Sequence, residues 1–193
     1  MDPVKIIEKY YATNIKLLKV LLVHSYAVAK KALKIAEKFP EVDKDFIYEA
    51  SILHDIGVIF TYIPKLNPDG KCPYIAHGYL GRALLEKEGL PKHALVCERH
   101  MGVGITKEEI IRKKLPLPER DMVPLTLEEK IIAFADKFYS KSPDRKMREK
   151  TVEEIIEELK KHGEEKVKIF KDWLKLFSLP MLLILFLKLL PAL

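Results

Sequence analysis

Apolar residues recur at intervals of three and four along almost the whole chain, and no convincing run alternates between apolar and polar positions. This spacing gathers apolar side chains on one face of a helix, whereas a half-buried strand would need a period of two. One such inward face is predicted from Val28, Ala32, Ile35, Ala36 and Phe39. The pattern therefore predicts an all-α protein that folds as a compact single-domain helical bundle.

Capping residues, prolines and glycines mark where the predicted helices begin and end. The longest runs from about residue 14 to Pro40 and should be bent or interrupted near His24, while Gly57 should end the next one. Three later helices should each begin with a capping box, in which a threonine is followed three residues later by a glutamate. Glu109 is the glutamate of the first of these boxes. Helices are thus expected at about residues 2–11, 14–39, 43–57, 77–88, 91–102, 106–114, 126–137, 151–162 and 164–177.

Composition narrows the class of protein. At 193 residues the chain is long enough for one well-buried core and short for two. The net charge is +6, but 28 acidic residues are mixed among 34 basic ones, which favours a charged surface over specific nucleic-acid binding. Two cysteines are too few for a disulfide framework, and no signal peptide is visible, so we expect a cytoplasmic protein.

The C-terminal segment is the most apolar part of the chain. Residues 176–187 are apolar apart from Ser178, and Pro180 lies among them. A membrane-spanning helix needs about 20 apolar residues, so no transmembrane span is expected. We expect this segment to pack against the core or against a second copy of the chain in a homodimer, and attachment to a membrane surface is the alternative.

The candidate chemistry lies in four histidines and two aspartates, each on or at the end of a predicted helix: His24, His54, Asp55, His77, His100 and Asp136. Imidazoles and carboxylates together suit divalent Fe, Mn, Ni, Co or Zn. Adjacent residues on a helix point about 100° apart, so His54 and Asp55 could share a metal only near a helix end, where Gly57 would let the backbone turn. The two oxygens of a carboxylate make Asp55 the natural ligand to bridge two metals.

The order of these residues resembles that of the HD-domain metal-dependent phosphohydrolases. The likeness rests on His24, on His54-Asp55 followed by Ile56-Gly57, and on Asp136 within Phe134-Ala135-Asp136-Lys137. The segments 98–106 and 120–124 further resemble those of uncharacterised archaeal HD-domain proteins.

The resemblance implies a helical bundle of the HD-domain type with a metal site between its central helices. His24, His54, Asp55 and Asp136 would bind one metal, and His77 with His100 would bind a second, bridged by Asp55, as in the binuclear branch of the family. We expect an N-terminal helical segment at residues 1–19, the metal-binding domain at 20–145, and C-terminal helices at 146–193 packed on the same domain.

The function implied by the resemblance is hydrolysis of a phosphoester or phosphoanhydride in a small phosphorylated substrate, most naturally a nucleotide. A metal-activated water would attack the phosphorus, with Asp55 and His54 at the catalytic centre. Val58 after the motif and Met101 after His100 depart from the cyclic-di-nucleotide branch and weigh against that substrate. Two alternatives stay open: a metal- or nucleotide-binding regulatory module without turnover, and a di-iron oxygenase that uses the same ligands.

Three cations are candidates for holding the substrate phosphate. In related symmetrical diadenosine tetraphosphate hydrolases an arginine follows the final aspartate at similar spacing, which makes Arg145 the first choice. Arg82 follows His77 and is the second choice, and Lys137 stands beside Asp136. Arginine suits bidentate phosphate contact, but a surface salt bridge is the alternative for each.

Overall fold

The computed structural model describes residues 1–140 and 148–180, and within them the chain is all-α, as predicted. Arg145 and the apolar segment beyond residue 180 lie outside the described residues. The described part contains nine α-helices, two 3-10 helices and only isolated β-bridges: α1 (Pro3–Tyr11), α2 (Ile15–Ala36), α3 (Lys44–Leu53), η1 (Ile56–Phe60), η2 (Tyr74–Ala76), α4 (His77–Lys87), α5 (Pro91–Arg99), α6 (Lys107–Lys113), α7 (Leu127–Asp136), α8 (Val152–Lys160) and α9 (Glu164–Ser178).

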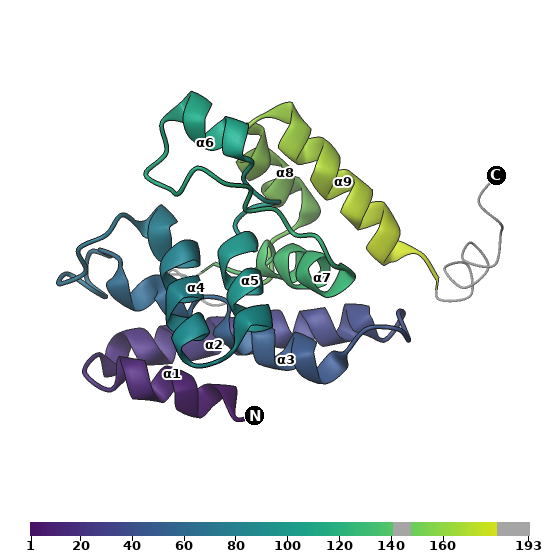
Figure 1. Cartoon of the computed structure of the whole chain (residues 1–193). Helices are drawn as coiled ribbons and strands as arrows, with labels where there is room; N and C mark the ends of the chain where they lie inside the picture. Colours follow the sequence, from purple (N-terminus) through teal and green to yellow (C-terminus); the bar gives the residue numbers. More distant parts are fainter. Residues whose placement is uncertain (141–147, 181–193) are drawn as a thin grey trace.

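The helices form one compact domain with α2 and α7 near its centre (Figure 1). Helix α2 packs against α3 and α7, and α4 packs against α5 and η1. Helices α8 and α9 pack on each other and, together with α6, cover the side of the domain opposite α1 (Figure 1). None of the helices described is long and apolar enough to cross a membrane.

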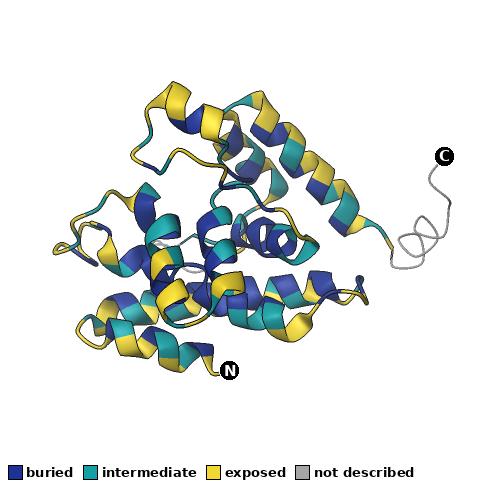
Figure 2. Cartoon of the chain, in the orientation of Figure 1, coloured by how far each residue is buried: buried dark blue, intermediate teal, exposed yellow. Residues whose placement is uncertain are grey.

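The core consists of two large apolar clusters that meet along α2. One contains the inward face predicted for this helix, and all five of its residues are buried against α7 and α9. The other joins α1 to α4, α5 and η1 around Tyr11, whose hydroxyl donates to the carbonyl of Ile56. Figure 2 shows the consequence, with buried positions turned inward on each helix and exposed positions outward.

The structure differs from two expectations about the backbone, an interruption near His24 and a helix end at Gly57. Helix α2 runs through His24 without interruption, because it contains no proline or glycine that would break it. Helix α3 ends at Leu53, and Gly57 lies within η1 instead of ending the helix. Gly57 serves close packing, since a Cβ there would collide with the backbone of His77 and Gly81 in α4.

Candidate metal centre

The six predicted ligands converge in the middle of the bundle, and all six are buried. His24 lies inside α2, whereas the others lie at helix ends: His54 and Asp55 follow α3, His77 begins α4, His100 follows α5, and Asp136 is the last residue of α7. Five separate helices thus supply side chains to one buried point, which a bundle achieves when its helix ends face inward.

The adjacent pair His54-Asp55 converges because the backbone leaves the helical conformation between the two residues. His54 still has helical backbone angles, with φ −55° and ψ −26°. Asp55 has φ −108° and ψ 10°, in the sparsely populated bridge region that often holds active-site residues. This change of backbone direction turns both side chains toward the same centre.

The first ligand group consists of His24, His54, Asp55 and Asp136, whose ligand atoms all lie within 4.8 Å of one another. The Nε2 atoms of His24 and His54 are 3.3 Å apart. Asp136 Oδ1 lies 3.0 Å from His24 Nε2, and Asp55 Oδ2 lies 3.1 Å from His54 Nε2. Two imidazoles and two carboxylates therefore surround one point.

The second ligand group consists of Asp55, His77 and His100. The Nε2 atoms of the two histidines are 3.2 Å apart, and each lies 3.3 Å from Asp55 Oδ1. Asp55 thus turns Oδ2 to the first group and Oδ1 to the second. This is the placement that a bridging carboxylate requires.

Backbone carbonyls orient three of the four imidazoles. The Nδ1 atoms of His54, His77 and His100 lie 2.6 to 2.7 Å from the carbonyl oxygen three residues earlier in the chain. A carbonyl oxygen can only accept, so each Nδ1 donates a proton and each Nε2 is the atom that faces the centre and could bind a metal.

This arrangement of nitrogens fits a metal. Two neutral imidazoles whose Nε2 lone pairs pointed at each other over such a distance would repel each other. A metal held at about 2.0–2.1 Å would separate two neighbouring nitrogen ligands by about 3.0–3.4 Å, the spacing that both histidine pairs have.

Charge is distributed unequally between the two groups. Burial lowers the pKa of His54, but the carboxylates of Asp55 and Asp136 outweigh it and raise this pKa to about 9. Burial lowers the pKa of His100 to about 4, and only Asp55 opposes it through a hydrogen bond and its charge. The first group therefore has the stronger preference for a positive charge.

A cavity of about 430 Å³ opens beside the second ligand group. Three predicted ligands, His77, His100 and Asp136, line it together with Lys137. Lys137 Nζ lies 3.4 Å from Asp136 Oδ2, so it is the one predicted phosphate contact found at the cavity within the described residues.

Arg82 is placed elsewhere. Its guanidinium is 2.5 Å from the buried carboxylate of Glu98 and 2.8 Å from Glu86, and it does not line the cavity. Glu98 also accepts from Arg120, so Arg82 belongs to an ion-pair network between α4, α5 and a loop. The geometry offers no support for a phosphate contact by Arg82, and the prediction for Arg145 stays a prediction.

Several cavity residues could not be recognised from the sequence. Tyr74 places its ring 4.8 Å from the ring of His77. Glu109, Lys113 and Lys166 line the wall formed by α6 and α9. Glu109 matched a capping box, but its carboxylate pairs with the two lysines instead of closing the box. No spacing rule connects α6 with a lysine more than 50 residues later.

The chain is similar to a known protein family and to several known proteins. A family model described as the HD domain matches residues 21–141. An uncharacterized protein of Methanocaldococcus jannaschii is 44% identical over 117 residues, which are 60% of this chain and 61% of that protein.

Two proteins named tRNA (cytidine(56)-2'-O)-methyltransferase also match, from Picrophilus torridus (36% identical) and Thermoplasma volcanium (30% identical). The matches cover 61% and 75% of this chain but only 30% and 38% of the two methyltransferases. The chain thus matches less than two thirds of the length of each of these three relatives.

Two solved structures have a similar fold. Both are the HD domain of the L. monocytogenes phosphodiesterase PgpH, one of them in complex with cyclic-di-AMP. The TM-scores are 0.53 and 0.52, with 19% and 18% sequence identity. The alignments cover 90% and 98% of this chain and 95% and 99% of the solved chains. At this identity the likeness establishes the shared fold.

Proposed function

Because the chain belongs to the HD-domain family, we propose that it is a metal-dependent phosphohydrolase with a two-metal centre that acts on a nucleotide. The observation that carries the proposal is the position of Asp55, which presents one carboxylate oxygen to each ligand group. His24, His54 and Asp136 would complete the first metal site, and His77 and His100 the second.

Bound metals would lower the pKa of a coordinated water and stabilise the negative charge that develops on the phosphate. The residues of the chain have separate tasks. Asp55 would bind both metals, one through each carboxylate oxygen, and His54 would bind the first metal. The ammonium of Lys137 stands beside Asp136 at the cavity, where it can donate to a phosphate oxygen. The carbonyls behind three of the histidines keep their rings from rotating.

The volume of the cavity and the ligand of one fold neighbour support a nucleotide substrate. The cavity lies within the range of small-molecule sites, about 300–1,000 Å³. The fold neighbour solved with cyclic-di-AMP holds a nucleotide in the same type of domain. The departures at Val58 and Met101 favour a different nucleotide for this chain.

A second candidate function is hydrolytic removal of a phosphate group from a substrate that derives from RNA. In two relatives the matching segment accounts for only 30% and 38% of a protein named as a tRNA methyltransferase. In that case the phosphate would belong to an RNA end or to a nucleotide released from RNA.

The test combines metal content with turnover. Protein purified without oxygen is analysed for metals and assayed with bis-p-nitrophenyl phosphate in Mn²⁺, Ni²⁺ or Co²⁺, followed by a panel of nucleotides and short RNAs. We expect about two metals per chain and hydrolysis that Asp55→Ala abolishes. Asp172→Ala, an exposed aspartate of α9, is the matched control and should change neither.

Metal binding without turnover under any of these metals would contradict the proposal and favour a regulatory module. Oxygen uptake by the iron-loaded protein in place of phosphate hydrolysis would favour an oxygenase.

A further inference from the structure

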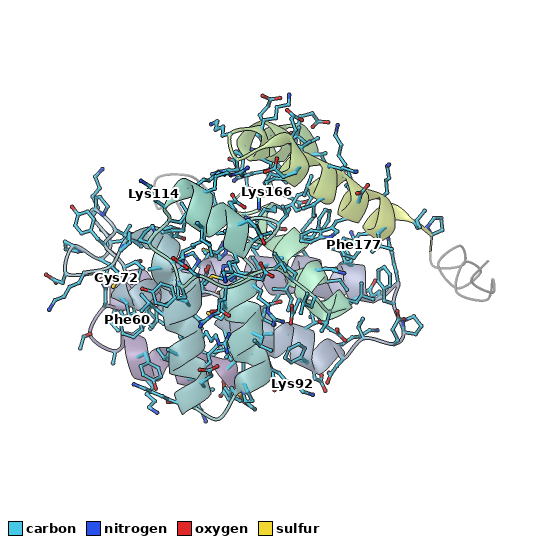
Figure 3. All side chains as sticks on the ribbon, turned by 45° about the horizontal axis from the view of Figure 1, so that its top comes forward. Phe60, Cys72, Lys92, Lys114, Lys166 and Phe177 are labelled. Atoms are coloured by element: carbon cyan, nitrogen blue, oxygen red, sulfur yellow. The ribbon has the colours of Figure 1, made fainter. Side chains whose placement is uncertain are left out.

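The wall of the cavity formed by α6 and α9 carries three charged residues that we call the α6–α9 triad: Glu109, Lys113 and Lys166. Lys166, labelled in Figure 3, donates to Glu109 Oε2 at 2.5 Å and to the carbonyl of Gly104 at 2.6 Å. Lys113 donates to Glu109 Oε1 at 2.8 Å and to the carbonyl of His162 at 3.0 Å. One carboxylate therefore holds two ammonium groups at the cavity.

Two members of the triad, Glu109 and Lys166, are buried, yet the triad can still bind a ligand. Lys166 is only 6% exposed and Glu109 only 8%, which is unusual for charged residues. An ammonium has three N–H donors, and each lysine uses two of them on the protein, so each can make one more hydrogen bond. A carboxylate has about four lone-pair positions, so Glu109 can also accept further bonds. The wall thus offers donors beside an acceptor.

Most of the remaining cavity lining, apart from the triad and the predicted metal ligands, is apolar. Much of the lining is aliphatic, and Met101, Ile105, Leu115, Ile155 and Leu159 contribute to it. The metal ligands come from α2 to α5 and α7, whereas the triad comes from α6 and α9 on the other side (Figure 1). A ligand that fills the cavity would therefore meet the predicted metal centre on one side and the triad on the other, with apolar side chains among the lining.

We propose that the α6–α9 triad recognises the base of the nucleotide, and that it favours bases with an oxo group at purine C6 or pyrimidine C4. This inference rests on the proposed function, because it takes the phosphate to lie at the metal centre. A lysine can donate but not accept, so it matches an oxo group and opposes an amino group. Guanine and uracil carry the oxo group beside a ring N–H, which Glu109 can accept. Adenine and cytosine present an amino donor at that place.

A second phosphate fits this wall less well than a base. Glu109 already neutralises one of the two lysines, which leaves the triad with one net positive charge. Phosphate sites commonly use arginine or the N-terminus of a helix, but the first turns of α6 and α9 each carry two glutamates. A wall with a carboxylate acceptor between two donors suits a neutral edge that has both donors and acceptors.

The experiment measures binding, so it does not depend on turnover. The full chain is loaded with Mn²⁺ and titrated calorimetrically with non-hydrolysable 5'-phosphonate analogues of GMP, UMP, AMP and CMP, and with ribose 5-phosphonate as the probe without a base. We expect the guanosine and uridine analogues to bind about tenfold more tightly than the other two, the effect of one charge-assisted hydrogen bond.

Variants of Lys113 assign the preference to the triad. This lysine is partly exposed, so its replacement should be tolerated. Lys113→Met should reduce the preference to less than about threefold, whereas Lys113→Gln, which keeps an N–H donor, should retain part of it. Lys107→Met, in the same helix but exposed and away from the cavity, is the matched control and should keep the full preference. Circular dichroism checks that each variant is folded.

Two results would overturn the proposal: nucleotide analogues that bind no better than ribose 5-phosphonate, or adenosine or cytidine analogues that bind more tightly than the guanosine and uridine analogues. If the base preference is found but bis-p-nitrophenyl phosphate is not hydrolysed, the proposed function fails while the base site stands. If hydrolysis is found without any base preference, the base site fails while the proposed function stands.

Discussion

Binding of a metal to the first ligand group should release a proton from His54. In the metal-free protein Asp55 and Asp136 raise the pKa of this imidazole to about 9, so at pH 7 the ring carries a proton that a metal must displace. The competition weakens the apparent metal affinity at pH 7 by about two powers of ten, since the pKa lies about two units above the pH. Affinity at this group should therefore rise about tenfold per pH unit between pH 7 and pH 9.

The second ligand group should behave differently. The pKa of His100 is about 4, so this ring carries no proton to displace at pH 7. Calorimetry in two buffers with different ionisation enthalpies counts the protons released per metal, and we expect about one for the first metal and close to none for His100. Asp136→Asn removes one of the carboxylates that raise the pKa of His54 and should flatten the pH dependence. Asp172→Asn is the matched control. A first metal that binds with equal affinity at pH 7 and pH 9 would refute this reasoning.

Other predictions concern metal content, packing and stability. Elemental analysis should find both metals lost in Asp55→Ala but chiefly the second in His77→Ala; equal losses would contradict a bridging role. Gly57→Ala should lower the free energy of unfolding by about 3 kcal/mol, because its Cβ meets backbone atoms that cannot rotate away. Gly89→Ala, which has a positive φ but open space around it, should cost only about 1 kcal/mol in the same denaturant titration. In the metal-free protein, the raised pKa of His54 stabilises the fold fully below pH 6.5, and this contribution should be lost as the pH rises through 9. The melting temperatures of wild type and His54→Asn should therefore converge over that range.

The helices and the ligand set were largely predictable from the sequence, for physical reasons. Helix periodicity and caps are local properties, so the boundaries of α7, α8 and α9 follow from residues within a few positions of each end. The six candidate metal ligands were recognisable through their order along the chain, and the structure places all six together.

Tertiary contacts explain what the sequence did not reveal. Gly57 looks like a helix terminator in isolation, and its actual role depends on how closely α4 approaches η1. Arg82 lies close to a ligand in sequence, but the buried carboxylate of Glu98 attracts its guanidinium away from the cavity. The α6–α9 triad joins residues that no local pattern relates.

The carbonyl behind each of His54, His77 and His100 affects how the protein tolerates mutation. Many metal-bound histidines are oriented by a carboxylate side chain, which a single substitution can remove. Here the Nδ1–H of each histidine donates to a main-chain carbonyl oxygen, that of Ser51, Tyr74 or Cys97, and every amino acid supplies such an oxygen. Evolution can therefore exchange these three side chains, and with them the surroundings of the centre, without releasing the imidazoles from their positions.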